Sequence, residues 1–295
     1  MTKYILSCDG GGVRGAASAR FLELLEEHIG KKAKDCFDLF AGTSTGSIIG
    51  VGISVAGLSG KKLCELYNYD NANVIMDKSI WDKLLGLKQG EPKYDGKGKR
   101  KTLKKFFGEK LLDDAIKPTL VVTYDVEKRV SAVLKSSKKA KIKALDAVDA
   151  SSAAPIYFPT RQVEQRWLID GGVIANNPAM CAYAEGVKIW PKDTEIKILS
   201  IGTGKRTRKI DGKESADFGA LGWITHDLMG VVMDESVVDY QCQTILGENY
   251  LRINSELADV NDDMDDCSRQ NIGSLKRLGE KWFADNKEKL TKFFS

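Results

Sequence analysis

Histidine is the scarcest of the residues that carry catalytic chemistry in this chain. Only two occur among 295 residues, His28 and His226. A mechanism with an imidazole base therefore has two candidates, and a zinc site built on more than two histidines is excluded. The six cysteines offer no substitute, because they are scattered, without a CxxC pair or a short Cys–His spacing.

The small net charge and the lack of targeting and membrane-spanning segments further narrow the class of protein. Lys and Arg number 45 against 41 Asp and Glu, a formal net charge of +4, which is too small and too mixed to indicate nucleic acid. No signal peptide is recognisable, and scattered cysteines in a chain of this length fit a reduced compartment, so we expect a cytoplasmic protein. The most apolar stretch, residues 37–58, contains several glycines and fits a buried strand, turn and helix better than a membrane span.

Strand-like and helix-like segments alternate along the first two thirds of the chain. Strands are expected at residues 4–8, 36–41, 120–124, 130–134, 163–169 and 196–201. Helical spacing occurs at 21–29 and 48–55, and Asn177-Pro178 is typical of a helix start. This order predicts an α/β fold with a mainly parallel sheet covered on both faces. Residues 207–295 are polar and helical in pattern, so we expect them to pack on the same domain as residues 3–206.

A serine lies between an expected strand and an expected helix, in the surroundings of a nucleophile elbow. In Gly42-Thr43-Ser44-Thr45-Gly46, a glycine stands two residues to each side of Ser44. A sharp strand-to-helix turn presents the hydroxyl, and the glycines remove side chains that would clash there. The helix start also supplies free N–H groups for a developing negative charge. A plain turn that packs a helix on a strand is the alternative interpretation.

A glycine-rich loop follows the first expected strand. Gly10-Gly11-Gly12-Val13-Arg14-Gly15 matches G-x-G-x-x-G, a pattern that either cradles a pyrophosphate or supplies the N–H groups of an oxyanion hole. A dinucleotide site requires an acidic residue about 20 positions on, at the end of the second strand. Asp35 precedes that strand, which runs instead into Ser44. The oxyanion hole is therefore favoured over a dinucleotide site and over a plain glycine turn.

Three residues are candidates for the base that accepts the serine proton. His28 falls within the first expected helix, away from any turn that would face Ser44. His226 would allow the chain order Ser-Asp-His, but no glycine turn or strand end aims it. Asp170 ends an expected strand before two glycines, and we expect the strand ends Asp9, Ser44 and Asp170 to meet at one edge of a parallel sheet. Asp170 is the preferred base, although a turn-forming Asp has the same pattern.

Together these motifs resemble those of the patatin-like phospholipases. The resemblance rests on Asp9–Gly15, Gly42–Gly46 and Asp170–Gly172. Further matching segments follow the family order: Pro92–Gly96, Ala150–Pro159, Asn176–Pro178 and Leu199–Gly204. The resemblance covers about residues 3–206, and the rest of the chain matches no motif of the family.

The resemblance implies a three-layer α/β/α fold and lipid acyl hydrolysis of the phospholipase A type, on phospholipids or galactolipids, without a metal or another cofactor. It implies that Ser44 is the nucleophile and Asp170 the proton acceptor of a dyad that forms an acyl-enzyme. The loop Gly10, Gly11, Gly12, Val13, Arg14 and Gly15 would form the oxyanion hole, with Gly42 and Gly46 shaping the elbow. A carboxylate with an ordinary pKa of about 4 is a weak base, so the site must raise that pKa by burial or rely on the oxyanion hole.

Two other functions stay open at this point. A carboxylesterase or thioesterase for small acyl substrates would use the same serine. A non-catalytic nucleotide- or lipid-binding module would leave Ser44 without a chemical role.

Charged runs predict surface contacts. Eight basic residues lie between Lys88 and Lys105, and five lysines between Lys135 and Lys143. Each basic residue near an anionic bilayer contributes about 1 kcal/mol, so peripheral membrane contact is predicted, with a solvated face as the alternative. Few aromatics are interleaved, which disfavours nucleic acid. The acidic run 259–266 starts like an EF-hand loop, but Met264 replaces its glycine and Gln270 its closing Glu, so no calcium site is predicted.

Overall fold

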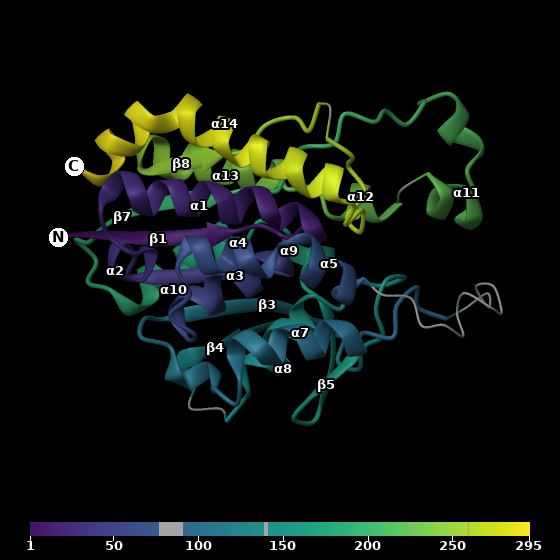
Figure 1. Ribbon diagram of the computed structural model, residues 1–295, viewed down its shortest axis with the longest axis horizontal. Helices are drawn as coiled ribbons and strands as arrows, with labels where there is room; N and C mark the ends of the chain where they lie inside the picture. The colour runs from purple at the N-terminus through teal and green to yellow at the C-terminus, as the bar shows by residue number, and fades with distance from the viewer. Residues whose placement is uncertain (77–90, 139–140, 227, 259) are drawn as a thin grey trace.

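The computed structural model describes residues 1–76, 91–138, 141–226, 228–258 and 260–295 (Figure 1). Within these residues, eight strands form one sheet in the order β5-β6-β3-β2-β1-β7-β8, with β4 also paired to β3. The strands are β1 (Thr2–Cys8), β2 (Leu39–Thr43), β3 (Thr119–Asp125), β4 (Val130–Lys135), β5 (Arg161–Val163), β6 (Arg166–Asp170), β7 (Glu195–Ile201) and β8 (Tyr250–Ile253). The five strands β3, β2, β1, β7 and β8 pair in parallel with their neighbours in this order. The prediction of a mainly parallel sheet is therefore confirmed.

Helices cover both faces of this sheet and give the α/β/α layering that the sequence predicted (Figure 1). Side chains of one strand alternate between two cores: Leu6 of β1 lies in the larger core and Ile5 in the smaller. The larger core is covered by α1 (Gly15–Ile29), α3 (Thr45–Ser54), α4 (Gly60–Leu66), α5 (Tyr69–Ile75), α7 (Lys97–Phe107), α8 (Ala144–Ser151) and α14 (Arg269–Phe294). The smaller core is covered by α10 (Ala179–Ile189) and α13 (Ser236–Leu246). Within the described residues, these elements are also connected by short helices: α2 (Ala33–Cys36), α9 (Gly172–Ala175), α11 (Ala220–Thr225) and α12 (Leu228–Val232).

Two expected strands have different bounds in the structure. The strand expected at 36–41 begins only at Leu39, because Cys36 belongs to the one-turn helix α2 and Asp38 closes the connection by accepting the Tyr4 N–H (3.1 Å). The strand expected at 163–169 is wrong as a single strand. The chain turns back at Glu164, which has a φ of 55°, and β5 and β6 form a hairpin.

The hairpin also changes the reason why Asp170 reaches the edge of the sheet. We expected a parallel strand, but β6 runs antiparallel to β3, with Asp170 opposite Thr123. Thr43 of β2 lies opposite Val122 of β3, so Asp170 still arrives at the edge where Ser44 follows β2. The hairpin folds back onto the end of β3, and the register, not the strand direction, brings the two residues together.

The C-terminal part contributes a strand that the sequence analysis did not predict. Ile198 of β7 lies opposite Tyr250 of β8, so residues 250–253 extend the parallel sheet. Helix α14 packs along α1 (Figure 1). A Cβ on Gly279 would lie 2.3 Å from the Ala17 carbonyl oxygen, so this glycine permits the close approach of the two helices.

Residues 37–58 form β2 and the buried helix α3, as the sequence predicted. Across the ranges described above, no helix combines the length and the apolar composition that a bilayer crossing requires.

Candidate active site

Ser44 occupies the turn between β2 and α3 in a backbone conformation that few residues other than glycine adopt. Its φ is 53° and its ψ is −123°, and such a conformation costs of order 1–3 kcal/mol. Hydrogen bonds fix it: the Ser44 N–H donates to Ser151 Oγ (2.9 Å), and the Ser151 hydroxyl donates to the Val122 carbonyl (2.7 Å). The backbone at Ser44 is therefore strained and held from two sides.

Both elbow glycines are required by close backbone contacts. A Cβ on Gly46 would lie 2.0 Å from the carbonyl oxygen of Cys8, and a Cβ on Gly42 would lie 2.3 Å from that of Gly46. Real Cβ atoms do not approach backbone this closely. The steric role that the sequence indicated for Gly42 and Gly46 is thus visible in the turn.

The loop Gly10–Gly15 joins β1 to α1 beside the elbow. A Cβ on Gly10 would lie 3.2 Å from that of Ser44, so the loop and the serine are in close contact. Four of its six N–H groups already donate to backbone carbonyls, those of Gly10, Val13, Arg14 and Gly15. In the described part of the chain, the N–H groups of Gly11 and Gly12 donate no hydrogen bond. These two groups are free to donate to a substrate oxygen.

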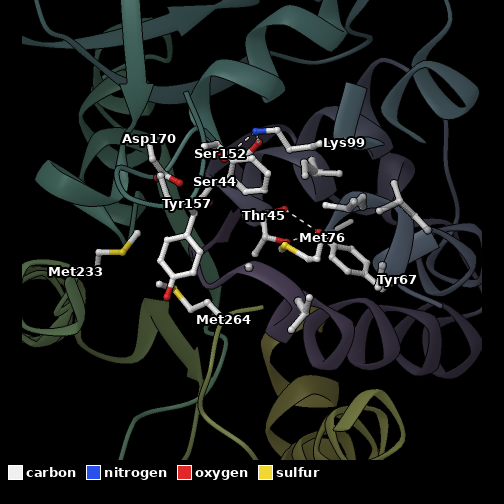
Figure 2. A pocket seen from close by; sticks show the side chains of 18 residues that line it. Ser44, Thr45, Tyr67, Met76, Lys99, Ser152, Tyr157, Asp170, Met233 and Met264 are labelled. Atoms are coloured by element: carbon white, nitrogen blue, oxygen red, sulfur yellow. Dashed lines mark hydrogen bonds between the residues drawn. The ribbon is translucent and has the colours of Figure 1, made fainter. Parts of the chain in front are cut away.

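Asp170 is fully buried at the end of β6, beside Ser44 (Figure 2). Its Oδ1 accepts the Gly172 N–H (2.8 Å), whereas its Oδ2 is a buried oxygen that forms no hydrogen bond with the described residues. Burial raises the pKa of Asp170 to about 6, against the opposing effects of the Ser44 hydroxyl, the Gly172 N–H and the Lys99 charge. This carboxylate is a stronger base than an exposed Asp and keeps one oxygen available.

The buried ammonium group of Lys99 holds the segment that positions Ser44 and Asp170. Lys99 of α7 is 2% exposed; its Nζ donates to the Ser152 carbonyl (2.8 Å) and pairs with Asp149 (3.0 Å). The segment that it holds, residues 149–153, contains Ser151, which binds the Ser44 N–H. It also contains the carbonyl of residue 153, which accepts the Asp170 N–H (3.1 Å). One segment therefore positions the serine and the carboxylate together.

Sequence reasoning missed the roles of Lys99 and Ser151. Lys99 was counted with an exposed basic run, yet it stands four residues before Leu103, a fully buried residue of α7. That i, i+4 spacing places Lys99 on the apolar face of the helix and is the signal that could have identified it. For Ser151 the sequence carries no comparable signal.

An apolar pocket opens at Ser44 and Asp170, as Figure 2 shows. Its empty space is about 690 Å³, including the mouth. Gly12 and Thr45 line it next to the serine, and its more distant walls are mainly apolar: Ile48, Leu66, Ile75, Met76, Phe158, Met233 and Met264. An apolar lining of this kind suits a hydrocarbon chain.

Neither histidine lines the pocket that contains Ser44 and Asp170. His28 is on α1, and its Nε2 lies 3.0 Å from the Thr291 hydroxyl of α14. His226 follows α11, where its ring stacks on that of Phe218 at 4.1 Å between centroids. Of the three candidate bases, only the Asp170 carboxylate lies at the pocket beside Ser44.

The basic runs are less exposed than their sequence indicated. Within the run 88–105, Lys99 is buried, Lys93 binds Asp265 (2.5 Å), and Arg100 binds Asp149 (2.8 Å). Residues Lys88 and Lys139 lie outside the described residues. The acidic run is also paired, because Arg208 binds both Asp262 and Asp263, and Asp259 again lies outside the described residues.

Fold and pocket together define a class: an α/β/α protein with a serine elbow at the edge of its sheet, next to an apolar pocket. The family model for patatin-like phospholipases matches residues 6–183. The chain therefore belongs to the patatin-like phospholipase family, which confirms the resemblance carried by its motifs.

Sequence alignments with related proteins cover nearly the whole chain. Patatin-like protein 2 of Oryza sativa subsp. indica is 28% identical over 94% of this chain and 82% of the relative. A cGAMP-activated phospholipase of Pseudomonas aeruginosa is 28% identical over 95% of this chain and 86% of the relative. The crystal structure of VipD from Legionella pneumophila aligns with 95% of this chain and 67% of that chain, at 14% identity and a TM-score of 0.45.

Proposed function

We propose that this protein is a serine lipid acyl hydrolase of the phospholipase A type, with Ser44 as nucleophile and Asp170 as proton acceptor. The observation that carries the proposal is the buried Asp170 Oδ2, which has no hydrogen-bond partner in the described chain and lies beside a strained serine at an apolar pocket. Membership of the patatin-like phospholipase family supports lipid hydrolysis.

The reaction follows from these positions. Asp170 takes the Ser44 proton as the serine oxygen attacks an ester carbonyl. The N–H groups of Gly11 and Gly12, which are free of acceptors in the described chain, stabilise the oxyanion. Asp170 passes this proton to the leaving alcohol, and the acyl group stays on Ser44. Water then gives a proton to the ionised Asp170 as it attacks the acyl carbonyl, and Asp170 returns this proton to the Ser44 oxygen as the fatty acid leaves.

The apolar pocket indicates the acyl part of the substrate. The surface that lines it is almost entirely apolar, and burying a methylene group contributes about 0.8 kcal/mol. A fatty-acyl ester of a phospholipid or galactolipid would therefore bind more tightly than a short acyl ester or thioester. This preference separates the lipid hydrolase from the small-substrate carboxylesterase or thioesterase.

The decisive experiment is a panel of lipids with identification of products. We expect the wild type to release fatty acid from a phospholipid or galactolipid, and Ser44→Ala and Asp170→Asn each to lower kcat at least a thousandfold with unchanged circular dichroism. Because one relative is named for activation by cGAMP, each lipid is tested with and without this compound.

His226→Ala is the matched control, because His226 is the alternative base and is exposed. Full activity in Asp170→Asn together with loss in His226→Ala would replace the dyad by a histidine-dependent site. A fluorophosphonate probe that labels the wild type but not Ser44→Ala supports the nucleophile. Absence of labelling would favour a non-catalytic binding module.

We also propose peripheral contact with an anionic membrane. Lys101 and Lys105 on α7 remain exposed, although other members of the run are paired. We expect salt-sensitive binding to vesicles that contain phosphatidylserine, weakened by Lys101→Gln with Lys105→Gln. Equal binding to neutral vesicles at high salt contradicts this proposal.

A further inference from the structure

The motif Leu199–Gly204 has no part in the reaction proposed above, yet it ends beside the glycine-rich loop. It covers the end of β7 and the turn that follows, where Thr203 is 4% exposed. The Thr203 hydroxyl donates to the Gly10 carbonyl (2.7 Å). A Cβ on Gly11 would lie 2.1 Å from the same hydroxyl oxygen, so the threonine side chain packs directly on the backbone of the loop.

This hydrogen bond fixes the peptide group that carries the Gly11 N–H. The Gly10 carbonyl and the Gly11 N–H belong to one planar peptide, so a donor that holds the carbonyl also sets the direction of the N–H. The peptide is trans, and its N–H therefore points away from the carbonyl oxygen that Thr203 binds. The Gly11 N–H is one of the two loop groups that donate no hydrogen bond in the described chain.

The order of the strands places Thr203 and Ser44 on opposite sides of the loop. Strand β1, which leads into the loop, lies between β2 and β7 in the sheet. Ser44 follows β2 and Thr203 follows β7, and both strands run parallel to β1. Because the Gly10 carbonyl binds Thr203 on the β7 side, the Gly11 N–H points to the side of Ser44.

The turn that carries Thr203 is itself held on both sides. The Gly202 carbonyl accepts the hydroxyl of Ser18 in α1 (2.8 Å). The Gly204 N–H donates to the side chain of Asn254, which follows β8 (2.9 Å). Helix α1 and the C-terminal part of the chain thus fix the position from which Thr203 reaches the loop.

The second loop N–H is fixed without Thr203. The Gly11 carbonyl, which shares a peptide with the Gly12 N–H, accepts the backbone N–H of Arg14 (3.2 Å) and its Nε (3.2 Å). Loss of the Thr203 hydroxyl should therefore disturb one donor and leave the other in place.

We propose that Thr203 is a positioning residue of the oxyanion hole, which aims the Gly11 N–H at the substrate oxygen by binding the Gly10 carbonyl. The proposal rests on the proposed function. The hydrogen bond to the carbonyl also polarises the peptide and makes its N–H a stronger donor. Thr203 does not line the apolar pocket, so it acts when negative charge forms on the substrate oxygen and not when the acyl chain binds. It should therefore affect kcat and leave KM unchanged.

Kinetics of Thr203 variants on p-nitrophenyl butyrate test this role. Removal of one oxyanion donor costs about 10²–10³ in kcat, so we expect Thr203→Val, which only misaligns a donor, to lower kcat by about ten- to a hundredfold at unchanged KM. Thr203→Ser keeps the hydroxyl and should restore most of the activity.

The matched control is Thr119→Val. Thr119 is 1% exposed, and its hydroxyl donates to the Lys117 carbonyl (2.9 Å). It lies at the start of β3, away from the strand ends that form the site. The control therefore removes another buried hydroxyl from a carbonyl and should keep the kcat of the wild type.

An inhibitor that forms an oxyanion distinguishes positioning from damage to the fold. Ser44 adds to the carbonyl of octyl trifluoromethyl ketone, and the resulting hemiketal oxygen carries the negative charge. In Thr203→Val its inhibition constant should rise by the factor by which kcat/KM falls, while the fluorophosphonate probe labels as many sites as in the wild type. A structural role alone would lower the number of labelled sites and leave the inhibition constant unchanged, which contradicts the proposal.

The outcomes separate Thr203 from the hydrolase itself. Unchanged kcat in Thr203→Val, or an equal loss in Thr203→Val and Thr203→Ser, would overturn the role of Thr203 and leave the hydrolase standing. A wild type that releases no product from the lipid panel or from p-nitrophenyl butyrate refutes the proposed function, and the role of Thr203 with it. Thermal unfolding establishes that each variant is folded, and the smaller substitution Thr203→Ala repeats the test, with the same expected loss, if Thr203→Val is not.

Discussion

At the scale of single residues, the turn at Ser44 keeps its strain only because its neighbours fix it. The backbone φ of 53° is unfavourable for any side chain with a Cβ, and glycine adopts it freely. Ser44→Ala and Ser44→Gly both remove the hydroxyl, so both should be inactive. We expect Ser44→Gly to be more stable than Ser44→Ala by about 1 kcal/mol in urea unfolding. Equal or lower stability of the glycine variant would show that the turn is not strained.

The pH dependence of the reaction depends on Asp170. Its pKa is raised to about 6 by burial, and only the ionised carboxylate accepts a proton. Activity should therefore be full well above pH 6 and fall as the pH drops through about 6. A pH profile of kcat/KM on p-nitrophenyl butyrate measures this limb. An acid limb near pH 4 would mean that burial does not raise the pKa of the group that accepts the proton.

Lys99 positions this base and also affects its charge. Lys99 lowers the pKa of Asp170 and holds the segment 149–153. Lys99→Met removes the charge from a buried site that faces Asp170, while Arg100 and Arg161 still neutralise Asp149. The acid limb of the pH profile should move to higher pH, and kcat should fall. The control is Lys97→Met, because the Lys97 side chain on the same helix is 89% exposed. If the acid limb does not move in Lys99→Met, the role of Lys99 is only structural.

At the scale of elements, a buried ion pair joins the end of β1, near the N-terminus, to β8 in the C-terminal part of the chain. Asp9 follows β1 at the same edge of the sheet as Ser44, as expected, because a Cβ on Gly46 would lie 2.7 Å from the Asp9 carbonyl oxygen. Its side chain, however, binds Arg252 of β8 (2.5 Å) and does not line the apolar pocket. Burial raises the pKa of Asp9 to about 7, and Arg252 opposes this. Both side chains are at most 8% exposed, so removing one partner leaves an uncompensated buried charge.

Arg252→Met should therefore lower the free energy of unfolding by about 3 kcal/mol. Lys281→Met breaks an exposed pair with Asp285 on α14 and should cost less than about 0.5 kcal/mol. Urea unfolding of both variants measures the contrast. Similar losses in the two variants would contradict the buried pair as a link between β1 and β8.

At the scale of the whole molecule, we propose that residues 3–206 and 207–295 fold as one unit. Strand β8 pairs with β7, and α14 buries Leu275 and Trp282 in the core that it shares with α1. A chain ending at residue 206 would expose that surface and should fail to fold. The complete chain should unfold with coincident transitions in circular dichroism and tryptophan fluorescence. A folded, active 1–206 fragment would contradict this unity.

Much of the fold and of the candidate site could be predicted because it depends on local patterns. Alternating apolar segments placed β1, β3, β7, α1 and α3, and glycine spacing located the turns at Ser44 and Asp170. Long-range contacts carry no such pattern. The pairing of the hairpin strand β6 with β3, the strand β8 and the burial of Lys99 each depend on partners far away in the sequence.

The sequence by itself determined the motifs, their order and the choice of Asp170 over two histidines, because glycine turns and strand ends are local features. Only the tertiary structure decided how these residues meet. The register of an antiparallel hairpin brings Asp170 to Ser44, and backbone pairing leaves Gly11 and Gly12 as the free donors within the described chain. Burial, which raises the pKa of Asp170, is a property of the packed molecule alone.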